Sequence, residues 1–451
     1  MNPYIYRIGL VLSLGFSSLA AQAGASPKNV VFLIGDGMGP AYTTAYRYFS
    51  AGDPATPPQP TVFDSLLVGM ATTFPDDDTW VTDSAAAATA LATGHKTYNG
   101  AIGIDRNEVP LTSLIAEARH RGMLTGVIAT SQINHATPAS FLAHDRHRKN
   151  YNAIADDYLG SDGHSPVADL LLGGGTSYFI RPDVNLINRF QERGYQYLNR
   201  LESLDKLTLP AIGLFAPQGL PPALGSAQPN RLSIMTKAAL TRMEATDRPF
   251  VLVVEASQID WCAHANDIAC AMSEMEDFAR TLTLVKEFID RRGDTLMVAT
   301  ADHSTGGLTL GRAGIYQWRA DLLRKVNMLP DDIARLLLAS PAELDNILQT
   351  QTGLQLSEQQ RTLFEQALSD DQDSSQEQLA ALVKNLIDEA TYTGWTTSGH
   401  DAIDVQVFAH GPGAALFQGM QDNTAIGQKL KALLPGRHIV AGASPAPGSS
   451  R

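Results

Sequence analysis

The 451-residue chain has 34 Lys plus Arg against 47 Asp plus Glu, a formal net charge of -13, and 44% of its residues are hydrophobic. This length and apolar content are enough for a large core, so one large domain with an insertion is favoured over several small domains. The acidic balance argues against a nucleic-acid-binding surface and against an anionic membrane partner. An anionic substrate stays open, because bound metal ions would dominate the local field.

The N-terminus predicts a signal peptide. Arg7 precedes an apolar stretch over residues 8–20, and the small A-x-A sequence of residues 21–23 follows. These are the parts of a cleaved secretory signal, so we expect residues 1–23 to be removed on export to a periplasm or beyond. An uncleaved membrane anchor is the alternative, but the stretch is short for spanning a bilayer. After cleavage no membrane association is expected.

Five short apolar runs predict buried strands. The runs are residues 30–34, 126–130, 250–254, 295–300 and 405–409. Runs of branched apolar residues separated by helical stretches are typical of buried parallel strands. Helices are expected at residues 84–93, 111–121, 230–246 and 268–291. This alternation predicts an α/β fold, in which a doubly wound, mostly parallel central sheet is flanked by helices.

The segment over about residues 313–392 has a different pattern, with helical periodicity and no apolar strand run. Capping boxes begin at Ser340, Ser357 and Ser374, each of which would open an amphipathic helix. We interpret this segment as a helical insertion between two strands of one domain that covers residues 24–441. Residues 442–451 are rich in Pro, Gly, Ser and Ala and are expected to form a disordered tail.

Residues that can bind metal ions accompany the five runs. They are Asp36, His135, Thr137, Glu255, Asp260, His264, Asp302, His303 and His400. Ligands gather where parallel strands end at their carboxyl side. Asp260 and His264 stand four residues apart, a spacing that suits two ligands of one ion, and the adjacent Asp302 and His303 can serve another. The pattern therefore predicts a metal-dependent hydrolase.

Ser84 is the candidate nucleophile. It opens an Ala-rich helix, and the free N–H groups and dipole at a helix N-terminus favour a negatively charged group such as a phosphoryl oxygen. A serine hydroxyl is a weak nucleophile unless a base or a metal ion lowers its pKa. No G-x-S-x-G sequence surrounds Ser84, so metal activation is the better explanation. In isolation, an ordinary N-cap serine would be the simpler interpretation.

Cys262 and Cys270 are the only two cysteines and flank His264. In an exported chain a disulfide is favoured, while free buried thiols and a thiolate metal ligand are the alternatives. Geometry decides between them, because an uninterrupted helix would hold the two Cα atoms roughly 12 Å apart.

Six segments together resemble the motifs of the alkaline phosphatase family. They are GDGMG from Gly35, TDSAAAATALATG from Thr82, HATPA from His135, VEASQIDWCAHAND from Val254, TADHSTGG from Thr300 and SGHD from Ser398. The resemblance implies hydrolysis of phosphate monoesters to an alcohol and inorganic phosphate through a phosphoserine. It also implies two Zn²⁺ and one Mg²⁺ per chain. Family members are commonly homodimers, so the resemblance allows a homodimer.

The resemblance also assigns roles to individual residues. Ser84 matches the nucleophile, and Arg148 matches the arginine that clamps phosphate oxygens, although Arg146 lies close by. The first zinc, which binds the leaving-group oxygen, matches Asp260, His264 and His400. The second zinc, which activates the serine, matches Asp36, Asp302 and His303. The magnesium site matches Asp36, Thr137 and Glu255.

Two substrate-binding positions depart from the best-known bacterial pattern of the family. An Asp usually stands at the place of His135 and a Lys at the place of Trp261. An imidazole should weaken the magnesium site, and an indole removes a positive charge near phosphate. Both changes bear on product release.

Three competing functions are weighed against this one. Nucleotide pyrophosphatases and phosphodiesterases of the same superfamily share the zinc ligands but usually have a Thr nucleophile and lack the magnesium site. Sulfatases need a C-x-P-x-R-type motif, whereas alanines follow Ser84. A non-catalytic exported zinc- or phosphate-binding protein would need the metal ligands but not Ser84.

Overall fold

The computed structural model describes residues 26–53, 55–160, 163, 165–369 and 375–436. The predicted signal peptide, at residues 1–23, and the predicted tail, at residues 442–451, both lie outside the described residues. Among the described helices, none combines the length and the apolar character needed to cross a bilayer.

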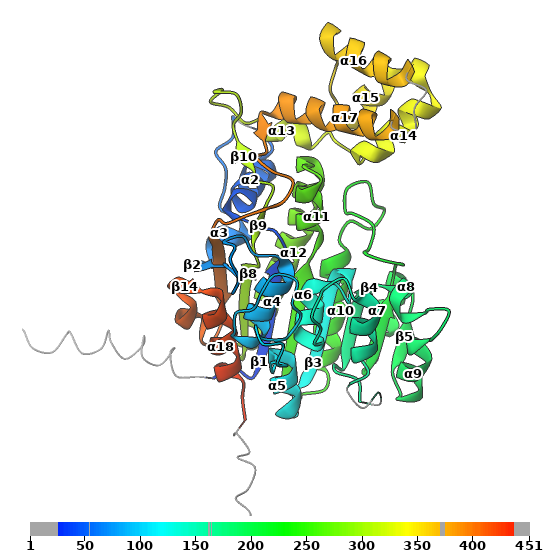
Figure 1. Cartoon of the computed structure of the whole chain (residues 1–451). Helices are drawn as coiled ribbons and strands as arrows, with labels where there is room; N and C mark the ends of the chain where they lie inside the picture. Colours follow the sequence, from blue (N-terminus) through cyan, green and yellow to red (C-terminus); the bar gives the residue numbers. More distant parts are fainter. Residues whose placement is uncertain (1–25, 54, 161–162, 164, 370–374, 437–451) are drawn as a thin grey trace, which may run out of the picture.

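A ten-stranded sheet forms the centre of the described chain, in the order β14-β2-β13-β8-β1-β7-β3-β4-β6-β5 (Figure 1). Its strands are β1 (Asn29–Gly35), β2 (Leu67–Thr72), β3 (Leu124–Gln132), β4 (Leu170–Gly174), β5 (Gln196–Leu198), β6 (Ala211–Leu214), β7 (Phe250–Ala256), β8 (Thr295–Ala301), β13 (Val405–His410) and β14 (Gly419–Asp422). All strand pairs are parallel except the two that β13 makes with β2 and β8. The predicted mostly parallel α/β sheet is therefore confirmed.

The centre of the sheet is built from the predicted apolar runs. β1 lies between β7 and β8, and every residue of these three strands is buried. The fifth run, β13, was predicted to be parallel, and this was wrong. An apolar run makes a buried strand in either direction, so its composition does not set its orientation. Because β13 runs the opposite way, its beginning lies at the edge where β1, β7 and β8 end.

Helices cover both faces of the sheet. On one face β7 and β8 contact α10 (Arg231–Glu244) and α12 (Ile268–Arg292), beside which lie α2 (Pro40–Ala51) and α3 (Val62–Leu66). On the other face lie α4 (Ser84–Thr93), α5 (Leu114–His120), α6 (Ala136–Leu142) and α18 (Asn423–Leu433). Smaller helices are α7 (Tyr151–Asp157), α8 (Thr176–Phe179), α9 (Leu186–Glu192), α11 (Gln258–His264), η1 (Leu201–Lys206) and η3 (Ala414–Phe417).

The segment predicted as an insertion is mainly helical where it is described, with turns and loops between its helices. It contains α13 (Ala320–Leu323), α14 (Pro330–Ala339), η2 (Pro341–Glu343), α15 (Leu344–Thr352), α16 (Glu358–Ser369) and α17 (Ser375–Thr391). The short strands β10 (Thr309–Leu310) and β11 (Thr393–Gly394) pair with each other, so the chain leaves and returns at one point. Figure 1 shows these helices together at one end of the molecule, beyond α11.

Local capping chemistry explains where the predicted helices differ from the observed ones. The helix expected from residue 111 begins at Leu114, because the Ser113 hydroxyl caps it by accepting from Ala116 N at 3.2 Å. Ser357 forms the predicted capping box with Gln360. Ser340 makes no side-chain cap, since a 3₁₀ turn intervenes before α15. Ser374 lies outside the described residues.

Cys262 and Cys270 form the disulfide that was favoured. Their Cα atoms are 5.5 Å apart, because α11 ends at His264 and α12 begins only at Ile268. The chain reverses direction between the two helices, so the distance expected for an unbroken helix does not apply. The bridge closes the loop that follows His264.

Candidate metal centre and nucleophile

The candidate ligands meet at the edge where the central strands end. Asp36 follows β1, Glu255 is the second-to-last residue of β7, and Asp302 follows β8. Two further short strands, β9 (Ser304–Thr305) and β12 (His400–Asp401), pair antiparallel and bring His400 to the same place. Long connections separate these residues in sequence, but the parallel sheet aligns the ends of its strands.

The turn after β1 needs a glycine beside Asp36. Gly37 has a φ of +70°, and a Cβ there would lie 2.8 Å from both Asp260 Oδ1 and Thr305 Oγ1. Only a residue without a side chain allows this conformation and this close approach. The Gly37 amide also donates to Asp302 Oδ1 at 3.1 Å. The Gly-rich turn therefore lets the carboxylates of Asp260 and Asp302 both lie close to Gly37.

Three groups of side chains have donor atoms that lie within 4.8 Å of one another and could each hold a metal ion. The groups are Asp260 with His264 and His400, Asp36 with Asp302 and His303, and Asp36 with His135 and Glu255. In the first group the Nε2 atoms of His264 and His400 are 3.1 Å apart, and His264 Nε2 is 3.3 Å from Asp260 Oδ2. In the second group His303 Nε2 is 3.4 Å from an oxygen of each carboxylate.

Backbone carbonyls hold the two outer imidazoles in position. His264 Nδ1 lies 2.6 Å from the Ser398 carbonyl oxygen, and His400 Nδ1 lies 2.8 Å from that of Thr82. A histidine whose Nδ1–H is held by a carbonyl presents its Nε2 lone pair to a metal ion. This orientation is what the donor groups of the site require.

The protonation states of the candidate ligands suit the binding of metal cations. Burial raises the pKa of Glu255 and of Asp302 to about 7 each. Burial, followed by the charge of Asp302, raises the pKa of Asp36 well above its usual range. Burial lowers the pKa of His135 to about 3 and that of His303 well below its usual value, so both rings are neutral. Neutral imidazoles and crowded carboxylates are the forms that ligate metal ions.

Several buried polar atoms at the site have no hydrogen-bond partner among the described residues. They are Asp36 Oδ1 and Oδ2, His135 Nδ1, Thr137 Oγ1, Glu255 Oε1 and Asp302 Oδ2. Leaving a buried polar atom unpaired is costly, and a charged one more so. Because these atoms come from the predicted ligands, the donor set fits bound metal ions.

Ser84 faces the second group of candidate ligands. It is the first residue of α4, is 1% exposed, and its Oγ lies 3.1 Å from His303 Nε2. The preceding residue, Asp83, caps the helix by accepting from Ala86 N at 2.9 Å. The predicted nucleophile and a predicted ligand of the second metal are therefore in contact.

Of the two candidate arginines, Arg148 reaches this site. Its Nη1 lies 3.0 Å from Asp83 Oδ2, and its Nη2 lies 3.4 Å from His135 Nε2. Arg146 instead pairs with Glu108 at 2.7 Å and is largely exposed. Trp261 lies next to His135, with ring centroids 5.7 Å apart in an edge-to-face arrangement. The predicted substrate-binding residues are thus neighbours.

Two supporting residues lay inside the recognised motifs but were not singled out from the sequence. Asp83 both caps α4 and holds Arg148. Thr305 donates to Asp260 Oδ1 at 2.6 Å and lies 3.2 Å from His303 Nδ1, which links the first two groups. Their position directly beside predicted site residues was the available signal. Only the folded arrangement shows what they contact.

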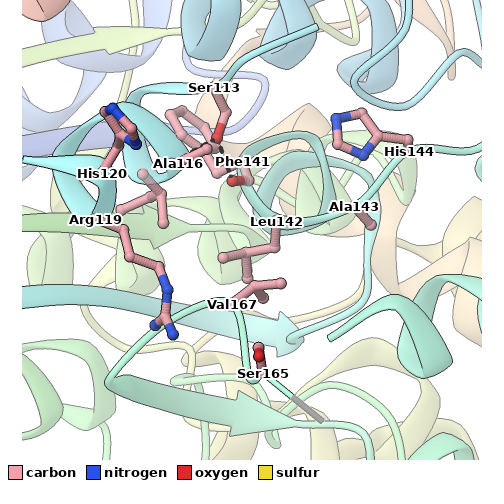
Figure 2. A pocket seen from close by; sticks show the side chains of 11 residues that line it. Ser113, Ala116, Arg119, His120, Phe141, Leu142, Ala143, His144, Ser165 and Val167 are labelled. Carbon is pink, nitrogen blue, oxygen red and sulfur yellow. Dashed lines mark hydrogen bonds between the residues drawn. The ribbon is translucent and has the colours of Figure 1, made fainter. Parts of the chain in front are cut away.

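Two hollows of similar size lie in different parts of the molecule. One, of about 440 Å³, lies beside α5 and the end of α6; it is lined by residues such as Ser113, Phe141 and Leu142 (Figure 2). It contains none of the predicted ligands and does not include Ser84. The other, of about 510 Å³, is lined by His264 and in part by residues of α17.

A mostly parallel α/β sheet that carries three metal-type groups and a serine at its carboxyl edge defines a metal-dependent hydrolase. The sequence matches the alkaline phosphatase family over residues 27–435. The chain therefore belongs to the alkaline phosphatase family and is a phosphomonoesterase.

Individual relatives agree with this assignment. The chain is 42% identical to alkaline phosphatase 3 of Bacillus subtilis, across 94% of this chain and 95% of that one. Its fold is similar to that of a cold-active alkaline phosphatase from Shewanella sp., with a TM-score of 0.85 and 46% identity over 90% of this chain and 100% of that one. It is also similar to a TAB5 alkaline phosphatase mutant, His to Asp, with Mg bound in the M3 site. There the TM-score is 0.67 at 27% identity, over 91% and 98% of the two chains.

Proposed function

We propose that the chain hydrolyses phosphate monoesters through a covalent phosphoserine at Ser84, with two zinc ions and one magnesium ion. The contact of 3.1 Å between Ser84 Oγ and His303 Nε2 carries this proposal, because it joins the nucleophile to the second group of metal-type residues. The donor chemistry supports the metal assignment. Groups that mix imidazole and carboxylate suit zinc, whereas the oxygens of Asp36, Thr137 and Glu255 suit magnesium.

The residues of the chain divide the reaction between them. The Ser84 oxygen attacks phosphorus while the bond from phosphorus to the ester oxygen breaks, and water later releases phosphate from the serine. Arg148, held by Asp83, binds two phosphoryl oxygens through its planar guanidinium, which stays charged at alkaline pH. When bound, the zinc ions would supply Lewis-acid stabilisation of the attacking and leaving oxygens.

Metal content and substrate preference test this function directly. Purified protein should contain zinc and magnesium in a ratio of two to one. It should hydrolyse 4-nitrophenyl phosphate far faster than bis(4-nitrophenyl) phosphate, because Arg148 and Ser84 are arranged for a phosphoryl group with free oxygens. Zinc together with magnesium should restore activity lost to a chelator. A faster diester rate would favour a phosphodiesterase, and activity that survives prolonged chelation would contradict the metal assignment.

Trp261 is proposed to weaken phosphate binding and so speed product release. Trp261→Lys would place an ammonium near His135, which contacts Arg148. A positive charge near dianionic phosphate contributes on the order of 1 kcal/mol at partly solvated distances, so the inhibition constant for phosphate should fall about five-fold or more. Where release limits turnover, kcat at alkaline pH should fall as well. An unchanged or weaker inhibition constant would show that this position does not set product affinity.

Magnesium affinity is the second property that depends on this neighbourhood. His135 contributes a neutral nitrogen to a group that otherwise consists of carboxylates. Magnesium prefers oxygen ligands, so this site should hold it more weakly than a site with three acidic residues. The magnesium bound in the His-to-Asp mutant of the TAB5 enzyme supports the same assignment.

Export and assembly also remain proposals. The charge and apolar pattern of residues 1–23 supports secretion to a periplasm or beyond, and the disulfide between Cys262 and Cys270 suits an oxidising compartment. Homodimer formation rests on the family resemblance. N-terminal sequencing of the mature protein tests the cleavage of residues 1–23, and the mass of the native protein tests the homodimer.

A further inference from the structure

The hollow of about 510 Å³ beside His264 is lined by residues from distant parts of the chain. On the metal side its lining includes His264, Asn266 and Ser398. The same lining includes Arg312, Lys384 and Asp388, of which the last two belong to α17. Its volume of about 510 Å³ is in the range of small-molecule sites. The helical segment therefore forms one wall of a space that borders His264 of the first metal group.

Two basic side chains give this space its charge. The backbone carbonyl of Arg312 accepts from Ile315 N at 3.0 Å, while its guanidinium makes no hydrogen bond and no ion pair within 4 Å among the described residues. Lys384 Nζ donates to the Ala265 carbonyl oxygen at 3.1 Å, which leaves further N–H groups of the ammonium for another acceptor. The nearby carboxylate of Asp388 feels the charge of Arg312 but forms no ion pair with it within 4 Å, so the guanidinium N–H groups stay available. These groups can therefore bind an anion.

Asp388 is the acidic residue of this lining. Burial raises its pKa to about 7, against the Trp395 hydrogen bond and the charge of Arg312. The Trp395 indole N–H donates to Asp388 Oδ1 at 3.3 Å, so this oxygen is engaged within the wall. Even when Asp388 is ionised, the two basic side chains leave one net positive charge on the lining. That charge matches a monoanion better than a dianion.

Trp395 gives the hollow a fixed, flat wall. Besides its bond to Asp388, its ring packs on Gly306, where an added Cβ would lie 2.7 Å from the indole. Gly306 directly follows Thr305, which contacts Asp260 and His303. The indole is thus held in position relative to the metal-type residues. An aromatic ring can stack on such a surface.

We propose that this hollow binds the leaving alcohol of substrates whose alcohol carries a carboxylate, with Arg312 and Lys384 as the groups that recognise it. The inference rests on the proposed function, in which His264 belongs to the metal group that receives the leaving oxygen. A guanidinium binds a carboxylate through two parallel hydrogen bonds, and the ammonium adds a third donor. The preferred substrates are then phosphate monoesters of hydroxy acids, with an aromatic ring favoured between the two groups.

A matched pair of substrates and variants tests the proposal. We would compare kcat/KM for 4-carboxyphenyl phosphate and phenyl phosphate in the wild-type holoenzyme and in the Arg312→Gln, Lys384→Gln double variant. Because each substrate is compared with itself between proteins, differences in leaving-group reactivity cancel. The double variant should lose about ten-fold on the carboxylated substrate and less than two-fold on phenyl phosphate, since charge-assisted hydrogen bonds are the strong ones.

The matched control is Arg335→Gln. Arg335 lies on α14 and pairs with Asp332, and it does not line the hollow. A single such change removes one positive charge from the same helical segment and should leave the ratio between the two substrates unaltered. Equal losses on both substrates in the double variant would mean that Arg312 and Lys384 only hold the segment in place. That result would overturn the proposal.

A binding measurement separates this proposal from the proposed function. Calorimetry can use 4-carboxyphenylphosphonate and phenylphosphonate, which cannot be hydrolysed. The wild-type protein should bind the carboxylated compound more tightly, whereas the double variant should bind the two compounds with equal affinity. An equal dissociation constant for the two compounds in the wild-type protein would reject the carboxylate site. Failure of the wild-type protein to hydrolyse either phosphate ester would instead contradict the proposed function, and the phosphonate comparison would still decide the subsite.

Discussion

Ser84→Ala is expected to lower kcat/KM for 4-nitrophenyl phosphate by roughly a thousand-fold or more, while the protein stays folded and keeps its metal ions. The variant loses the oxygen that attacks phosphorus. The three groups of His, Asp and Glu side chains stay complete in this variant, so metal analysis should find the wild-type content. Water can attack the same phosphorus atom, but it lacks the fixed position that α4 gives the serine oxygen.

A labelling experiment separates the covalent route from direct hydrolysis. Acid quenching after mixing with radiolabelled monoester should leave phosphate on the wild-type protein and none on Ser84→Ala. The matched control is Ser140→Ala, because Ser140 is another buried serine, on α6, whose hydroxyl donates to Ala136 O at 2.9 Å and contacts Thr89 of α4. That variant should keep both labelling and turnover. Near wild-type turnover in Ser84→Ala would remove Ser84 from the mechanism.

The centre of the fold was predictable because its strands are buried on both faces. β1, β7 and β8 are continuous runs of apolar residues, which a parallel sheet covered by helices requires. The shorter strands β2 and β4 contain glycines, and β-branched residues occur only at Val68 and Thr72 of β2, so their composition gave no comparable signal. The antiparallel direction of β13 depends on where the preceding chain returns to the sheet, which no local pattern encodes.

The candidate site was predictable as a set of residue types but not as an arrangement. The position of Asp36 after β1 and of Asp302 after β8 follows from the sheet itself. His400 contacts His264 from a position 136 residues away, through the pairing of β9 with β12. The spacing of the matched motifs favoured Arg148 over Arg146, and only the fold shows that Arg148 pairs with Asp83 while Arg146 pairs with Glu108. Contacts between loops require the tertiary structure.

Asp36→Asn should have the largest effect on metal content, because Asp36 belongs to two of the three groups. The variant should keep metal chiefly at Asp260, His264 and His400 and lose roughly a thousand-fold or more in turnover. Asp169→Asn is the matched control. Its carboxylate accepts from Thr125 N at 2.9 Å and belongs to none of the groups, so metal content should not change. Full metal content in Asp36→Asn would contradict the shared ligand.

Asp36→Asn should be less stable than the wild type when metal ions are bound and more stable than the wild type when they are removed. Bound ions add about 4 kcal/mol per site at a thousand times the dissociation constant, so the wild-type holoenzyme should unfold at the higher temperature. Without ions, carboxyl groups of raised pKa such as Asp36, Asp302 and Glu255 stabilise the protein only while they are protonated. The contribution of Asp302 and Glu255 is complete below about pH 4 and is lost as pH rises through about 7, and that of Asp36 is lost in the same direction. Thermal unfolding at pH 9 with a chelator should therefore find Asp36→Asn more stable than the wild type, because the amide removes one buried charge. A less stable variant under those conditions would show that the metal ions do not act by relieving repulsion among these carboxylates.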